Sequence, residues 1–104
     1  MYTIDEIRQA VLTAVDAYNG IAREGREIIR VELFGSYASG NQGSDSDVDF
    51  LVEFASPVVG LFALAQVLEL FEQQFDCSVD MVPLPLPEDS FLEIGRTVPL
   101  YAAA

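Results

Sequence analysis

The chain has 104 residues, 51% of them hydrophobic, which predicts one folded domain over residues 1–104 and argues against disorder. Seventeen acidic residues face five arginines, with no lysine or histidine, so the formal net charge is −12 and direct binding of nucleic acid is not expected. No apolar stretch reaches the roughly 18 residues of a membrane span, the first residues do not resemble a signal peptide, and the single cysteine, Cys77, cannot form an internal disulfide. The expected location is therefore the cytoplasm. The acidity has two explanations, either solubility alone or the attraction of a basic protein partner.

The first third of the chain predicts a helix followed by a strand. Thr3 and Glu6 form a capping-box pattern, and apolar residues recur at helical spacing from about residue 3 to 18, with a prolongation to about Gly25 as the alternative end. Residues 28–34 predict a strand. Its inward residues are expected to be Ile29, Val31 and Leu33. A short helical turn is expected over residues 36–39.

The remainder predicts further strands around a long helix. A second strand is expected over about residues 48–54, then a helix over about 58–75, a third strand over 77–82 and an edge strand over 98–101. The apolar stripe expected on the helix consists of Leu61, Leu64, Ala65, Leu68, Phe71 and Phe75. Three apolar residues fall outside that stripe and belong either to the core or to an interface, namely Phe62, Val67 and Leu70. Pro83, Pro85 and Pro87 predict an extended connector, followed by a short helix to about Ile94.

One stretch carries the candidate chemistry. Asp47 and Asp49 share one face of the second strand, because side chains alternate along a strand. The opposite face is wholly apolar and should anchor the strand to the core, with Val48, Phe50, Val52 and Phe54. Gly35 and Ser36, which ten residues separate from Asp47, lie in a turn of small residues, where backbone N–H groups and a hydroxyl can approach an anion.

These residue types fit a Mg²⁺-dependent reaction on a nucleotide. Nucleotidyl transfer uses two Mg²⁺ ions held by carboxylates at a shared site, and Asp47 and Asp49 can supply that bridge. Asp80 lies in mid-strand opposite an apolar face, which makes it the candidate third carboxylate and proton acceptor. The Gly35 N–H and the Ser36 hydroxyl would hold the β- and γ-phosphates of the nucleotide. A calcium loop and an acidic turn without a ligand are the alternatives, but an EF-hand requires Gly where Phe50 stands.

Together, the Gly35-Ser36 pair, the ten intervening residues and Asp47-Val48-Asp49 resemble the signature of the DNA polymerase β-type nucleotidyltransferase superfamily. The length and the run GSYASG…SDSDVDFLV are similar to its minimal nucleotidyltransferase (MNT) branch. The resemblance implies an α/β (α+β) fold, with a small mixed sheet of about three to four strands flanked by helices. It also implies that Asp47, Asp49 and Asp80 bind metal and that Gly35 and Ser36 bind the triphosphate.

The resemblance further implies a function. Many MNT proteins act as antitoxins of HEPN-domain ribonuclease toxins and transfer AMP from ATP to a tyrosine of the toxin. The chain departs from the family at Ser39, where an arginine often stands; the loss of that cation would either weaken triphosphate binding or leave a protein that works only by docking. The leading hypothesis is AMP transfer from Mg-ATP to a partner toxin. The alternatives are an antitoxin that masks its partner by contact alone, and nucleotidylation of a small molecule, against which the short chain argues.

Overall fold

The computed structural model describes residues 2–43, 45–86 and 95–103. In these residues four strands form one mixed sheet in the order β3-β2-β1-β4. Strand β1 is antiparallel to both β2 and β4, and β2 is parallel to β3. The elements are α1 (Ile4–Asn19), β1 (Ile28–Phe34), α2 (Ser36–Ser39), β2 (Val48–Phe54), α3 (Leu61–Glu72), β3 (Val79–Leu84) and β4 (Val98–Ala102). The predicted α/β class with a small mixed sheet is therefore confirmed.

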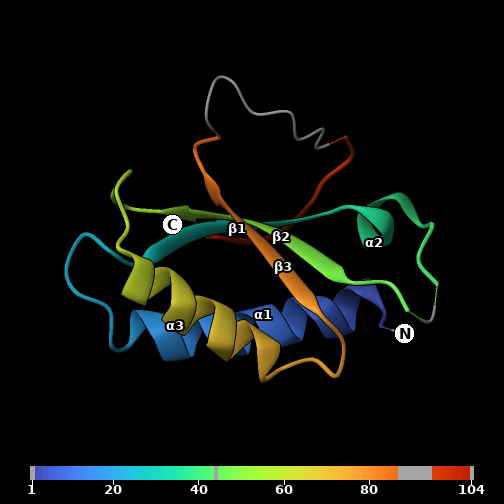
Figure 1. The fold of residues 1–104 in the computed structure, drawn as a ribbon, viewed down its shortest axis with the longest axis horizontal. Coiled ribbons are helices and arrows are strands. Elements are labelled where there is room, and N and C mark those ends of the chain that lie inside the picture. Colours follow the sequence, from blue (N-terminus) through green and yellow to red (C-terminus); the bar gives the residue numbers. More distant parts are fainter. Residues whose placement is uncertain (1, 44, 87–94, 104) are drawn as a thin grey trace.

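Helices α1 and α3 cover one face of the sheet, and the core lies between them and the strands (Figure 1). The predicted capping box begins α1, since the Thr3 hydroxyl accepts from the Glu6 N–H and the Glu6 carboxylate accepts from the Thr3 N–H. The buried face of α1 consists of Ile7, Val11, Ala14, Val15 and Tyr18. The helix ends at Asn19, so the alternative of a prolongation to Gly25 is wrong. No helix in these three ranges combines the length and the hydrophobicity needed to cross a membrane.

Strand β2 is anchored as the sequence predicts. Its buried face consists of Val48, Phe50, Val52 and Phe54. The Phe50 ring packs edge-on against the Phe71 ring of α3, with centroids 5.2 Å apart. This apolar face fixes the strand to the helices, so that Asp49, on the opposite face, is held in a fixed position.

The inward face of β1 differs from the prediction at one residue. Ile28 is fully buried and Ile29 is only partly buried, although Val31 and Leu33 point inward as expected. The reason is a β-bulge between Ile28 and Arg30, which adds one residue to β1 relative to β2. A bulge shifts the alternation by one residue, and the sequence pattern carried no sign of it.

The bounds and the buried face of α3 also differ from the prediction, because the helix begins at Leu61 and ends at Glu72. Val67 and Phe71 are fully buried, whereas Leu61 is 84% exposed and Phe62 is 95% exposed. Since α3 is apolar on most sides, periodicity could not fix which side meets α1 and β2. Of the three residues left open, Val67 belongs to the core, Leu70 is partly buried against it, and Phe62 is on the surface.

Strand β3 begins two residues later than predicted and continues through Pro83 to Leu84. The predicted connector therefore starts later, at Pro85. A proline is tolerated here because β3 is at the edge of the sheet, where a missing N–H can face away from the neighbouring strand. Strand β4 forms the opposite edge, as predicted. The short helix predicted up to Ile94 lies outside the described residues.

Candidate active site

The turn between β1 and α2 brings the backbone against a carboxylate. Gly35 has φ 76° and ψ −154°, a conformation that residues with a side chain rarely adopt. A Cβ atom at this position would lie 2.1 Å from Oδ2 of Asp49. Glycine is thus required both for the backbone conformation and for the close approach. The predicted neighbourhood of the Gly-Ser turn and the acidic strand is confirmed for Gly35 and Asp49.

The residue at position 39 strengthens this turn. The Ser39 hydroxyl donates to the Gly35 carbonyl oxygen over 3.1 Å, and the Ser39 N–H donates to the same oxygen over 3.2 Å. Gly40 then ends α2 in the left-handed conformation, with φ 79°. The Ser39 hydroxyl therefore stabilises the turn by a hydrogen bond to its backbone. An arginine at this position has no hydroxyl to make that bond.

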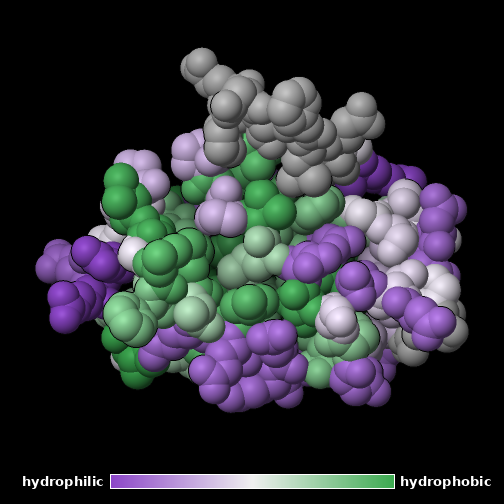
Figure 2. Space-filling view, viewed as in Figure 1, coloured by the Kyte–Doolittle hydropathy of each residue, from purple (hydrophilic) through white to green (hydrophobic). Residues whose placement is uncertain are grey.

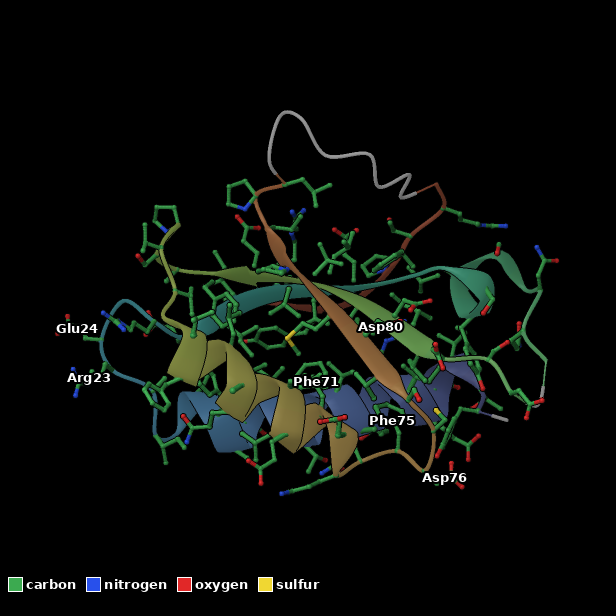
Figure 3. The ribbon with its side chains drawn as sticks, viewed as in Figure 1. Arg23, Glu24, Phe71, Phe75, Asp76 and Asp80 are labelled. Carbon is green, nitrogen blue, oxygen red and sulfur yellow. The ribbon has the colours of Figure 1, made fainter. Side chains whose placement is uncertain are left out.

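Two of the three predicted carboxylates come together. Asp49 of β2 and Asp80 of β3 are direct partners in the parallel register, and their side chains are in hydrogen-bonding contact. Figure 3 shows Asp80 on β3, with β2 beside it. The partner of Asp49 on the other side is Phe34, the residue before Gly35. Three neighbouring strands thus place Asp49 between the Gly-Ser turn and Asp80.

The electrostatics of Asp49 reflect this crowding. Burial raises the pKa of its carboxyl from 3.8 to about 6, helped by the hydrogen bond to Asp80 and by the negative charges of Asp80 and Asp47. Described ion pairs in this chain connect Arg8 with Asp5, and Arg30 with Glu32 and Glu53. None of the described ion pairs neutralises the crowded carboxylates.

Asp47 stands apart from the other two. It precedes β2, is exposed, and acts on the pKa of Asp49 through its charge alone. Within the part of the chain that the structure describes, no three acidic, cysteine or histidine side chains are close enough to hold one metal ion together. The structure thus shows a close pair with a third carboxylate nearby. Repulsion between the negative charges of the three carboxylates is a sufficient reason for Asp47 to lie apart from Asp49 and Asp80.

The donor set nevertheless fits a hard divalent cation. Carboxylate oxygens are the ligands that Mg²⁺ prefers, and burial, together with the hydrogen bond to Asp80 and the charges of Asp80 and Asp47, raises the pKa of Asp49, as expected for a carboxylate without a positive partner. Asp49 and Asp80 could hold such an ion between them, with Asp47 completing the set.

A hollow beneath α2 was not predicted. It has a volume of about 330 Å³ and brings Arg96 together with Tyr37, Ser39, Gly40 and Gln42. The side-chain oxygen of Gln42 is buried there and has no hydrogen-bond partner among the described residues. The sequence held no local sign of this hollow, because Arg96 lies more than 50 residues after α2.

The sequence and the fold agree with known proteins of one class. Residues 15–97 match the family model described as the nucleotidyltransferase domain. The chain therefore belongs to the nucleotidyltransferase domain family. A protein adenylyltransferase of Thermococcus cleftensis, MntA, is 34% identical over 82 residues, which cover 79% of this chain and 78% of that protein.

Two further proteins are similar to this chain. A provisionally named protein adenylyltransferase of Methanocaldococcus jannaschii is 29% identical over 83 residues, which cover 79% of each chain. A crystal structure of a toxin-antitoxin with AMP-PNP contains a chain that superposes with a TM-score of 0.70 at 20% identity, covering 92% of this chain and 73% of that one. The resemblance to MNT-type antitoxins is confirmed, and the superposition shows the shared fold.

Proposed function

We propose that this protein is an adenylyltransferase antitoxin, which transfers AMP from ATP to a hydroxyl of a partner toxin. Membership of the nucleotidyltransferase domain family supports a transferase. The names of the two relatives support protein as the acceptor and AMP as the group transferred, and the toxin-antitoxin neighbour supports a toxin partner. We propose further that the partner is a HEPN-domain ribonuclease and that the acceptor is a tyrosine.

The observation that carries the proposal is the contact of Gly35, Asp49 and Asp80. The backbone of Gly35, which has no Cβ atom, lies against the carboxylate of Asp49. That carboxylate contacts the carboxylate of Asp80 on the next strand. Gly35 and Ser36 would bind the β- and γ-phosphates of ATP through the backbone N–H and the hydroxyl. This binding would place the α-phosphate above the ends of β2 and β3, beside the aspartates.

The reaction exchanges one phosphorus–oxygen bond for another. The acceptor oxygen forms a bond to the α-phosphorus, the bond from that phosphorus to the bridging oxygen of the β-phosphate breaks, and pyrophosphate leaves. Asp80 would accept the proton of the acceptor hydroxyl. Asp47, Asp49 and Asp80 would hold Mg²⁺, which when bound supplies the positive charge that the triphosphate requires.

A second function is favoured by one observation. Asp47 does not join the pair formed by Asp49 and Asp80. If the three carboxylates never converge, the protein would neutralise its partner by contact alone.

Neutralisation of the toxin by aspartate variants separates the two functions. Asp49→Asn and Asp47→Asn remove a charge at nearly constant shape, and Asp45→Asn in the exposed loop is the matched control. In cells that express the toxin encoded beside this gene, we expect Asp45→Asn to restore growth and the other two variants to fail. If Asp49→Asn restores growth as well as the wild type does, the protein neutralises its partner by contact alone.

A further inference from the structure

An apolar groove runs between the first half of α3 and the edge strand β3. It has a volume of about 270 Å³ and is lined by Leu61, Leu64, Ala65, Leu68, Met81 and Pro83. Figure 2 shows apolar side chains gathered over this part of the molecule. Leu61 is 84% exposed although it is a large aliphatic residue. Such a surface usually marks a site of protein association.

The groove does not end at α3. A neighbouring hollow of about 170 Å³ shares Leu64 and Pro83 with it and extends to Pro57 and Pro85. Another, of about 280 Å³, shares Pro57 and Pro85 and reaches Glu53. The apolar surface therefore continues around the end of β3, and it is longer than a pocket for a small molecule would need to be.

Strand β3 connects this surface to the candidate active site. Met81, which lines the groove, directly follows Asp80 in the strand. At roughly 3.3 Å per residue, Pro83 lies about 10 Å along the strand from Asp80. Met81 and Asp80 point to opposite faces of this edge strand, so a protein segment in the groove lies across the edge of β3 from the carboxylates, and the part of that protein that extends around the edge would reach them.

The charge of this chain distinguishes between a second copy of itself and a basic protein as the partner that binds in the groove. Glu72 continues the groove-facing positions of α3, two helical turns after Ala65, whereas Glu53, in the far hollow, is paired with Arg30. Arg26 approaches the start of α3 near Gly60, so the acidic border of the groove lies at the other end of α3. Two copies of this chain would each carry a net charge of −12 and would repel each other. A basic partner would be attracted.

We infer that the groove between α3 and β3 docks the acceptor protein, through an apolar segment of that protein flanked by arginine or lysine. This inference rests on the proposed function for the identity of the partner. Docking at the edge strand β3 holds the acceptor protein across that edge from Asp80, so the groove selects which protein is modified.

A substitution in the groove tests the inference. Ala65→Arg places a long cationic side chain in the groove, and Ala17→Arg makes the same change at an exposed position of α1. The probe is the purified product of the gene adjacent to the one encoding this chain. We expect Ala65→Arg to raise its Kd, measured by calorimetry, about tenfold or more, and Ala17→Arg to leave the Kd within about twofold. Leu61→Ser, at an exposed position, is the second variant and should raise the Kd about threefold to tenfold.

Transfer of labelled AMP distinguishes this inference from the proposed function. Ala65→Arg should require a higher partner concentration for half-maximal labelling and reach the wild-type rate at saturation, whereas Asp49→Asn should bind with the wild-type Kd and transfer no label. An unchanged Kd for Ala65→Arg and Leu61→Ser, or no binding by the wild type, would overturn the docking inference. A wild-type dimer in light scattering that Ala65→Arg dissociates would show a second copy in the groove instead. Binding that Ala65→Arg weakens, without label on the partner of the wild type, would support the groove and refute the transferase.

Discussion

The raised pKa of Asp49 predicts how the substitution Asp49→Asn changes the free energy of unfolding, whatever its effect on catalysis. In Asp49→Asn the amide keeps the size of the carboxylate and can donate to Asp80, but it carries no charge. The pKa of Asp49 rises from 3.8 to about 6, so the charged form is disfavoured in the folded protein. A difference of about two pKa units corresponds to roughly 3 kcal/mol. Because Asp49 is only partly buried and water screens its charge, we expect about 1–2 kcal/mol.

The sign follows from the raised pKa. Below about pH 4 the carboxyl is protonated in both the folded and the unfolded chain, and the substitution should change little. Between about pH 4 and 6 the unfolded chain releases the proton while the folded chain keeps it, so the stability that Asp49 contributes falls as the pH rises. Above about pH 6 the loss is complete. Asp49→Asn should therefore be the more stable protein at neutral pH.

Urea denaturation in EDTA measures this effect. We expect the free energy of unfolding of Asp49→Asn to exceed that of the wild type by about 1–2 kcal/mol near pH 7.5 and to match it near pH 4. Asp45→Asn, in the exposed loop, should show no such gain at either pH. A variant that is less stable than the wild type at pH 7.5 would show that Asp49 is not under electrostatic strain.

Three other predictions concern the turn, the core and the metal. Gly35→Ala should lower the free energy of unfolding by about 1–3 kcal/mol and abolish AMP transfer, because the new Cβ atom would collide with Asp49. Gly43→Ala is the control, since a Cβ atom there would have no atom within 4 Å, and it should change neither urea denaturation nor transfer. Phe71→Ala should cost about 3–5 kcal/mol in urea denaturation, and Phe62→Ala should stay within about 0.5 kcal/mol because its side chain is 95% exposed; equal losses would contradict the orientation of α3. EDTA should abolish transfer of label from ATP and Mg²⁺ should restore it, because the chain supplies few cations of its own; transfer that continues in EDTA would refute the metal requirement.

Local patterns predicted most of the fold. The Thr3 capping box, the alternation in β2 and the Gly35 turn each depend on residues close together in the sequence, and all three are confirmed. The pairing of Asp80 with Asp49 was predicted as a hypothesis from the alternation in β3, and their contact is confirmed, while their roles stay predictions.

The predictions were wrong where packing between distant parts of the chain determines which side chains are buried. The bulge at Ile29 adds a residue that alternation alone does not reveal. The buried face of α3 is chosen by contacts with α1 and Phe50, because the helix itself is apolar on most sides. Asp47 precedes β2, which begins at Val48, so its place on one face with Asp49 stays a prediction.

AMP transfer itself is tested by following the α-phosphate of ATP. The purified protein is incubated with Mg²⁺, with ATP labelled at that phosphate, and with the product of the adjacent gene; the partner is then digested and its labelled peptide is sequenced by mass spectrometry. We expect one AMP on a tyrosine of the partner, with no label when Asp49→Asn replaces the wild type. A partner that is bound and neutralised by the wild-type protein but carries no AMP would contradict this expectation.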